Sequence, residues 1–208
     1  MSEREDITLA TYQANADQYR QLTGALSAPM LRFLDKFADL VGTGRILEIG
    51  SGPGREAKYL EARGLQVART DATPAFVDMM RADGFAAELL DVRTDELGGP
   101  YAGVLANAVL LHLSRPDIKS VTERVSQALV PAGLLAFTLK EGDGEAWSND
   151  KLGSPRYFTY WREPAVRTLL QESNWEIVSI ERTANSEQPW INVLARTPPK
   201  LANGAQTV

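Results

Sequence analysis

Residues 46–54 have the sequence Ile-Leu-Glu-Ile-Gly-Ser-Gly-Pro-Gly, a short apolar run that ends in three glycines spaced two apart. A helix-compatible segment, 55–63, follows directly. Glycine is needed where the backbone has a positive φ or where a ligand lies against the main chain. The first turn of the next helix offers unpaired N–H groups. The stretch therefore predicts a buried strand, a tight turn and a helix that bind a nucleotide-like ligand. The alternative, a turn that binds nothing, needs one special glycine rather than three.

The glycine spacing separates two classes of cofactor. The dinucleotide fingerprint is G-x-G-x-x-G, whereas Gly50, Gly52 and Gly54 give G-x-G-x-G, and Arg55 stands where the third dinucleotide glycine would be. The segment 48–54 resembles the glycine-rich first motif of class I S-adenosylmethionine-dependent methyltransferases. This resemblance extends over residues 10–196. It implies S-adenosylmethionine as cofactor and S-adenosylhomocysteine as product, and it disfavours a nicotinamide oxidoreductase.

Length and composition indicate one soluble domain. The chain has 208 residues, of which 44% are hydrophobic, enough for one substantial core. The absence of cysteine excludes disulfides, thiolate metal ligands and a cysteine nucleophile. No apolar run approaches the length of a membrane span, and the charged N-terminus lacks the apolar core of a signal peptide. We therefore expect a cytoplasmic protein that does not associate with membranes.

The charge balance favours a small-molecule partner. The net charge is −5, whereas proteins that follow a phosphate backbone usually carry a basic excess. The one local basic stretch, with Lys151, Arg156, Arg162 and Arg167, is diluted by acids and is also typical of a solvated surface. We expect a small-molecule acceptor and no nucleic acid. The sequence leaves a monomer and a homodimer both open.

Alternating apolar runs and helix-like segments predict an α/β fold with a doubly wound, mostly parallel sheet of seven strands. The connection 183–190 is too short for a crossover helix, so the last two strands must form an antiparallel hairpin. Such a C-terminal hairpin strand is similar to the Rossmann-like methyltransferase fold. The expected strands are 45–49, 65–70, 86–90, 101–106, 134–139, 175–182 and 191–196, and the expected helices are 7–22, 27–41, 55–63, 74–83, 116–129 and 165–172.

The expected organisation is a single methyltransferase domain over residues 1–197. Within it, residues 1–41 are expected to form N-terminal lid helices and residues 140–163 a substrate-cap insert. Residues 198–208 are polar, with proline and glycine, and are expected to be a disordered tail.

Acidic residues follow the second and third strands, at the edge where ligands bind in open α/β sheets. Asp71 ends strand two, where a carboxylate accepts hydrogen bonds from ribose hydroxyls; its alternative is a surface or helix-capping role. The resemblance implies that Asp91, after strand three, accepts from the adenine amino group, while the neighbouring main chain at Val92 meets a ring nitrogen. Asp95 and Glu96 lie near enough to leave a shifted register open.

The resemblance implies further cofactor contacts. Phe76 packs on the adenine face, or in the helix core, and the main chain near Asn107 receives the methionine amino group. Glu48 orients the loop or reaches that amino group indirectly. Tyr19 caps the carboxylate end through its hydroxyl, whereas Tyr12 is equally typical of a buried aromatic stripe. The full expected cofactor set is Tyr19, Glu48, Gly50, Ser51, Gly52, Gly54, Asp71, Ala72, Phe76, Asp91, Val92 and Asn107.

His112 is the one histidine of the chain and follows strand four, near the expected acceptor position. Its ordinary pKa suits a general base near neutral pH. The alternative is a structural histidine, as related proteins carry one here for packing or main-chain bonding.

Residues 140–161 combine aromatic residues with cations, and we expect them to cover the acceptor. Lys140 and Arg156 would pair with a carboxylate or phosphate, with Tyr157 and Tyr160 beside them. The alternative is a short strand that packs its aromatics inward and leaves Arg156 in water. No set of His, Asp and Glu has metal-ligand spacing, so no metal is expected.

These observations predict a methyltransferase that moves a methyl group to an oxygen or nitrogen atom of a small molecule by in-line displacement. One alternative is a regulatory protein that binds S-adenosylmethionine or S-adenosylhomocysteine without turnover. An RNA or tRNA methyltransferase is less favoured, because the Asn-Pro-Pro-Tyr type of signature is absent after strand four.

Overall fold

A single sheet of seven strands organises the chain in the computed structural model, which describes residues 3–183 and 188–198. The strand order is β3-β2-β1-β4-β5-β9-β8. The bounds are β1 Arg45–Ile49, β2 Gln66–Asp71, β3 Ala87–Leu89, β4 Tyr101–Ala106, β5 Leu129–Lys140, β8 Glu176–Thr183 and β9 Trp190–Arg196. β1, β2, β3, β4 and β5 pair in parallel, and β9 pairs antiparallel with both β5 and β8. The predicted fold class, including the C-terminal hairpin, is confirmed.

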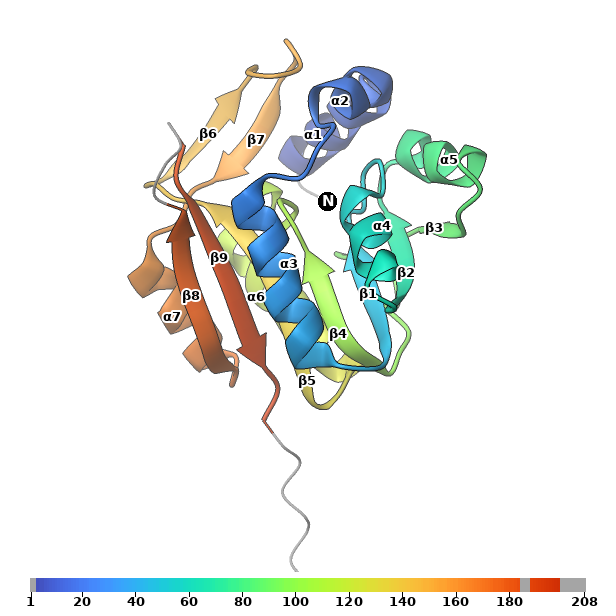
Figure 1. Ribbon diagram of the computed structural model, residues 1–208. Coiled ribbons are helices and arrows are strands. Elements are labelled where there is room, and N and C mark those ends of the chain that lie inside the picture. Colours follow the sequence, from blue (N-terminus) through green and yellow to red (C-terminus); the bar gives the residue numbers. More distant parts are fainter. Residues whose placement is uncertain (1–2, 184–187, 199–208) are drawn as a thin grey trace, which may run out of the picture.

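Helices cover both faces of this sheet (Figure 1). α3 (Ala28–Val41) and α4 (Arg55–Ala62) lie on one face, α6 (Arg115–Ala128) and α7 (Glu163–Glu172) on the other, and α5 (Pro74–Ala82) packs beside β2 and β3. Neighbouring residues of a strand point to opposite faces, so Ile46 packs with Phe37 of α3, while Leu47 belongs to the cluster that holds Ile118 of α6. The strands are therefore buried on both sides, which explains their continuous apolar runs.

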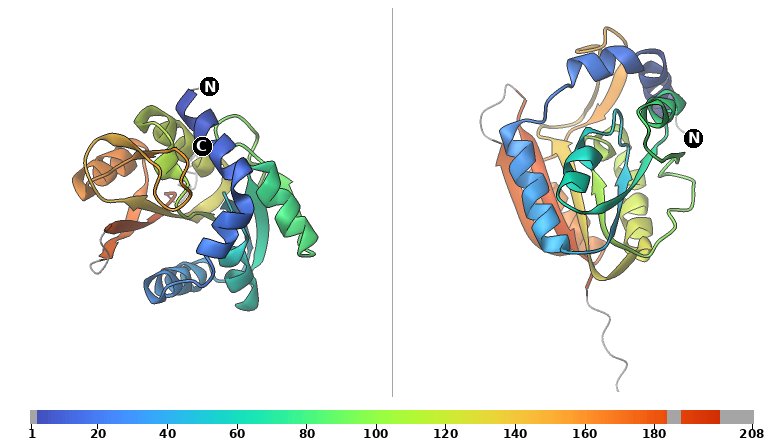
Figure 2. Two further views of the ribbon diagram at one scale, coloured as in Figure 1. Left: turned by 90° about the horizontal axis from the view of Figure 1, so that it is seen from above. Right: turned by 45° about the vertical axis from the view of Figure 1, so that its right-hand side comes forward.

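A second layer lies beyond the carboxyl ends of the parallel strands (Figures 1 and 2). It consists of α1 (Glu3–Ala14), α2 (Ala16–Leu22) and a hairpin of β6 (Glu145–Ser148) with β7 (Arg156–Thr159). Hydrogen bonds join α1 to the hairpin: Thr11 donates to the carbonyl of Pro155 at 2.7 Å, the Tyr157 N–H donates to the Thr8 hydroxyl at 3.0 Å, and Arg4 donates to Glu145 at 3.0 Å. The carboxyl ends of the parallel strands are thus covered by the N-terminal helices and by a hairpin from the later part of the chain (Figure 1).

Two local features differ from the sequence prediction, and a third expectation lies almost wholly outside the described residues. The expected helix 7–22 is broken at Asn15, whose amide donates to the carbonyl of Thr11 at 2.8 Å and competes with helix continuation. β5 begins at Leu129 rather than Leu134, because the segment 129–133 extends alongside the start of β4 across a register shift. The expected tail 198–208 lies outside the described residues apart from Pro198.

Within the described chain, every helix is too short or too polar to cross a membrane.

Candidate active site

The glycine loop between β1 and α4 has the left-handed backbone that its sequence predicts. Gly50, Gly52 and Gly54 have φ values of 66°, 52° and 77°. A Cβ atom on Gly50 would come within 2.4 Å of Val109 Cγ2, and one on Gly52 would face the Tyr19 ring at 3.8 Å. The loop therefore needs glycine at Gly50 for both backbone and packing reasons.

Asp71, the last residue of β2, fastens this loop. Its carboxylate accepts the N–H of Gly52 at 2.8 Å and the N–H of Thr73, just before α5, also at 2.8 Å. Only 6% of Asp71 is exposed. Burial raises its pKa, and the two N–H donors oppose that rise. Each oxygen keeps a second lone pair for a ligand hydroxyl.

Two more buried acids stand behind the loop. Glu48 in β1 is buried, and burial together with the nearby Glu56 raises its pKa to about 8. Glu56 in α4 pairs with Arg55 at 3.0 Å and accepts the Asn107 amide at 2.8 Å. A cationic group beside Glu48 would lower the pKa of this carboxyl and favour its charged form.

The end of β4 is held in an unusual conformation. Ala108 has φ of 56°, which is uncommon for a residue other than glycine. Thr138 of β5 stabilises it, because the Thr138 hydroxyl accepts the Ala108 N–H at 2.8 Å and donates to the Asn107 side chain at 2.7 Å. The conformation brings the main chain at Asn107 and Ala108 to the wall of the cavities described next.

The first cavity, of about 110 Å³, lies over the glycine loop. Tyr12, Tyr19 and Phe76 fill much of it, with ring centroids 5.4 to 6.0 Å apart. Pockets for ligands of drug size usually span about 300–1,000 Å³, so a nucleotide-like ligand would displace these rings. The sequence-predicted residues that line this cavity are Tyr19, Gly50, Gly52, Asp71, Ala72, Phe76, Asp91, Val92 and Asn107.

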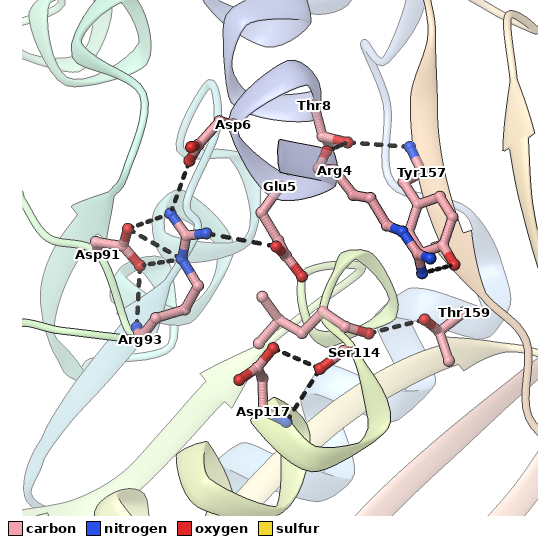
Figure 3. A network of polar contacts seen from close by, with 11 residues as sticks. Arg4, Glu5, Asp6, Thr8, Asp91, Arg93, Ser114, Asp117, Tyr157 and Thr159 are labelled. Carbon is pink, nitrogen blue, oxygen red and sulfur yellow. Dashed lines mark hydrogen bonds and ion pairs between the residues drawn. The ribbon is translucent and has the colours of Figure 1, made fainter. Parts of the chain in front are cut away.

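An ion-pair cluster, drawn in Figure 3, includes three residues that line this cavity: Glu5, Asp91 and Arg93. The Arg93 guanidinium binds Asp91 at 2.6 Å, and it lies 3.8 Å from Glu5 and 3.7 Å from Asp6 in α1. Arg93 holds the pKa of Asp91 below its ordinary range, against the opposing effect of burial. Glu5 is buried, and neither of its carboxylate oxygens has a hydrogen-bond partner in the described part of the chain. Arg93 therefore ties α1 to the loop after β3.

His112, in the short 3₁₀ helix Leu110–His112, is fixed through both ring nitrogens. Nδ1 lies 2.6 Å from the carbonyl oxygen of Tyr157, and Nε2 lies 2.9 Å from the Tyr12 hydroxyl. A carbonyl only accepts, so Nδ1 carries the proton and Nε2 accepts from Tyr12. Burial lowers the pKa of His112 to about 3, and nearby Arg156 and Lys140 act in the same direction. The ring is therefore neutral near pH 7.

A second, larger cavity of about 1120 Å³ lies between the second layer and the end of the sheet. Tyr12, Tyr19, Asn107, Ala108 and His112 line both cavities and form their junction. Lys140, at the end of β5, and Arg156, at the start of β7, line the larger cavity. Two ligands, one in each cavity, would therefore contact each other beside Tyr12 and His112.

Comparison with known proteins identifies the family. The family model described as a methyltransferase domain matches residues 18–180. The chain belongs to this methyltransferase family. No curated protein matches it in sequence.

Solved structures share the fold of this methyltransferase domain at low identity. The 1,6-didemethyltoxoflavin-N1-methyltransferase of Burkholderia thailandensis, solved with 1,6-didemethyltoxoflavin and S-adenosylhomocysteine, has a TM-score of 0.76 and 18% identity over 95% of this chain and 92% of that one. The magnesium protoporphyrin IX methyltransferase of Synechocystis PCC 6803, solved with S-adenosylmethionine, has a TM-score of 0.73 and 13% identity over 95% of this chain and 98% of that one. The [4+2]-cyclase SpnF has a TM-score of 0.75 and 14% identity over 94% of this chain and 96% of that one. The fold alone therefore does not fix the reaction.

Some sequence-predicted residues lie outside the two cavities of the methyltransferase domain. Glu48, Ser51 and Gly54 are buried in β1 and in the glycine loop and line neither cavity. Tyr160 packs near Phe158, and the Tyr157 ring contacts Arg4 and Trp147, so neither lines a cavity. The segment around Arg156 is a short strand, but Arg156 itself is buried rather than in water.

Sequence reasoning missed Arg93 and Lys151, and it gave Tyr12 too little weight. Tyr12 lies at the junction of the cavities, Arg93 on the wall of the smaller one, and Lys151 on the wall of the larger one. Arg93 stands two residues after Asp91, and Lys151 belongs to the local basic stretch, which is equally typical of a solvated surface. In the described part of the methyltransferase domain, no three His, Asp or Glu side chains are grouped so that they could hold a metal ion.

Proposed function

We propose that the protein is an S-adenosylmethionine-dependent methyltransferase that moves a methyl group to an oxygen or nitrogen atom of a small-molecule acceptor. The observation that carries the proposal is the meeting of two cavities at Tyr12 and His112, one over a glycine loop and one under a cap. The family membership supports methyl transfer, and the overall negative charge supports a small acceptor rather than a nucleic acid.

The residues of the smaller cavity fit the proposed cofactor. Gly50 and Gly52 leave the main chain bare, and Asp71 has lone pairs for ribose hydroxyls. Phe76 and the main chain at Val92 would hold the adenine. Asp91 would accept from its amino group, in competition with Arg93. The positive charges of the sulfonium and ammonium groups would lower the pKa of Glu48, so that its charged form faces them, and the main chain at Asn107 would receive the ammonium.

When bound, S-adenosylmethionine supplies an electrophilic methyl group, whose bond to sulfur breaks as its bond to the acceptor forms, leaving S-adenosylhomocysteine. The protein's own contribution is to align the acceptor atom with that methyl group, and to exclude water with α1 and the β6–β7 hairpin. Alignment of this kind can lower a barrier by several kcal/mol, on the order of 10⁵-fold in effective concentration.

His112 accepts the proton that the acceptor atom loses. The Nε2 lone pair accepts the Tyr12 hydroxyl proton at 2.9 Å, so the transfer passes through Tyr12, whose hydroxyl gives that proton to Nε2 as it takes the proton of the acceptor atom. The acceptor atom becomes far more acidic as it gains the methyl group and positive charge, so a weak base suffices late in the reaction. The roles of Lys140 and Arg156 are to hold the acceptor in the larger cavity.

Calorimetry with S-adenosylhomocysteine, followed by a turnover assay, tests the proposal. We expect binding by the wild-type chain, and S-adenosylhomocysteine release from S-adenosylmethionine when a small-molecule extract is added but not with buffer alone. His112→Gln should lower that release by roughly 10²–10⁴-fold without changing S-adenosylhomocysteine affinity. Binding without release from any extract would instead support the non-catalytic regulatory protein, and absence of binding would refute both.

A further inference from the structure

Three cationic side chains of the larger cavity lie near one another and form no ion pair with an acid among the described residues. Lys140 ends β5, Arg156 begins β7, and Lys151 lies in the loop between β6 and β7. None of the three has a carboxylate within ion-pair distance in residues 3–183 and 188–198. Arg55 and Arg182 line the same cavity, but each pairs with a glutamate. Arg32 of α3 also lines it and is exposed to solvent.

Arg156 is the buried member of this group. It is 6% exposed; one of its Nη atoms donates to the carbonyl of Asp150, and the other lies 3.4 Å from the Tyr12 hydroxyl. Its Nε is buried and has no partner among the described residues. A buried guanidinium N–H without a hydrogen-bond acceptor destabilises the folded chain. A ligand oxygen beside Arg156 would supply that acceptor.

The three cations contact the faces of aromatic rings instead of carboxylates. Lys140 Nζ lies 3.8 Å from the ring centroid of Phe158, and the Arg156 guanidinium lies 5.2 Å from the same centroid. Lys151 Nζ lies 5.0 Å from the ring of Tyr19. Such contacts hold a cation in place but leave its charge uncompensated.

The remaining charged groups of the cavity do not cancel this excess. Asp150 is an exposed acid at the same wall, and Glu181 is paired with Lys36 at 2.5 Å. Burial lowers the pKa of Lys140, and repulsion from Arg156 lowers it further, with Asp150 opposing; Lys151 shows the same trend. A bound anion would relieve both the burial cost and the mutual repulsion.

We propose that Lys140, Arg156 and Lys151 form an anion subsite, and that the methyl acceptor is a small molecule bearing a carboxylate or phosphate group. The identification of the bound anion as a methyl acceptor rests on the proposed function, whereas the anion subsite itself does not. Arg156 offers planar donors that suit two oxygens of either group, and Lys140 adds a point charge.

The geometry also limits how far the anionic group of the acceptor can lie from the atom that is methylated. Arg156 Nη1 lies 3.4 Å from the Tyr12 hydroxyl, which bonds His112 Nε2 at 2.9 Å. The anionic group and the methylated atom must therefore be only a few bonds apart. Hydroxy acids, amino acids and the corresponding small phosphates meet this requirement.

Calorimetric titration of the full chain with inorganic phosphate and with lactate, against sodium chloride of equal ionic strength, tests the subsite. We expect saturable binding of at least one anion, weakened at least tenfold in Lys140→Met and in Lys151→Met. Lys119→Met is the matched control, since Lys119 is exposed on α6 and pairs with Glu172 at 3.3 Å. The two titrations also show whether phosphate or carboxylate is preferred.

No saturable binding of either anion, or equal binding by wild type, Lys140→Met and Lys151→Met, would overturn the subsite. S-adenosylhomocysteine titration of the same samples keeps the two proposals apart. If anions bind and S-adenosylhomocysteine does not, the proposed function fails while the subsite stands. If S-adenosylhomocysteine binds to every variant but anions bind to none, including wild type, only the subsite fails.

Discussion

Replacement of Asp71 by asparagine tests whether one carboxylate both closes the glycine loop and binds the cofactor. Each carboxylate oxygen accepts one buried N–H at 2.8 Å, from Gly52 and from Thr73. Asparagine keeps one oxygen and turns an NH₂ group toward the other N–H. One buried donor thus loses its acceptor, which costs about 1–3 kcal/mol. For a chain of this size, we expect the melting temperature to fall by roughly 2–12 °C.

The same substitution removes the charged acceptor for the ribose. Hydrogen bonds to charged groups contribute about 1.5–3 kcal/mol each, so the S-adenosylhomocysteine Kd should rise by at least about tenfold. Calorimetry measures the Kd, and thermal unfolding measures stability. Asp78→Asn is the control, because Asp78 lies on α5 with 76% of its side chain exposed, 3.7 Å from Arg81.

Each measurement can refute one role separately. An unchanged Kd in a folded Asp71→Asn protein removes the ribose role. A melting temperature equal to that of Asp78→Asn removes the role in closing the loop. If only the Kd changes, the N–H groups of Gly52 and Thr73 have found other acceptors, and the loop is less rigid than the two 2.8 Å bonds indicate.

Three further predictions concern stability. Because the folded pKa of His112 is about 3 against an ordinary 6.5, the unfolded chain binds its proton first as pH falls; the free energy of unfolding should drop by up to about 1.4 kcal/mol per pH unit below pH 6.5. Urea unfolding of wild type and His112→Gln between pH 7 and pH 4.5 should show the difference between them changing with this slope, and a constant difference would contradict the neutral ring. Arg93→Met should cost about 3 kcal/mol of unfolding free energy, since it leaves Glu5 buried and unpaired; adding Glu5→Gln should recover much of the stability, and no recovery would argue against the ion pair. Gly50→Ala should cost at least about 1–2 kcal/mol from its φ of 66° alone; Val109→Ala in the same chain should relieve the added clash at 2.4 Å, measured as a non-zero coupling energy in a double-mutant cycle.

Sequence reasoning located the sheet well because each strand carries its own local signal. β1 and β4 begin and end where their apolar runs do, at Arg45–Ile49 and Tyr101–Ala106. Apart from Arg45, which is exposed, and Ala102, which is partly buried, the residues of these strands are buried, and Glu48 is the one charged side chain among them. The glycine loop was equally predictable, since a positive φ leaves a direct trace in the residue type.

The second layer left weaker traces. Nothing local to Asn15 predicts its bond to the Thr11 carbonyl rather than a continuous helix. The pairing of Tyr12 with His112 joins residues 100 positions apart, and neither residue type requires the other. The side chain of Tyr157 points toward Arg4 although its carbonyl holds His112, a distinction that a sequence pattern does not carry.

The two halves of the site are therefore specified in different ways. The proposed cofactor half is built from strand ends, where chain direction and sheet order place Gly50, Asp71 and Asn107 at one edge of the sheet. The proposed acceptor half is built by α1, α2 and the β6–β7 hairpin, which are not required by the strand–helix alternation. Residues there can change without disturbing the sheet, which is consistent with a fold that this chain shares, at 13–18% identity, with two methyltransferases and a [4+2]-cyclase. For that reason the charges around Arg156 are a better guide to this acceptor than the substrates of its structural neighbours.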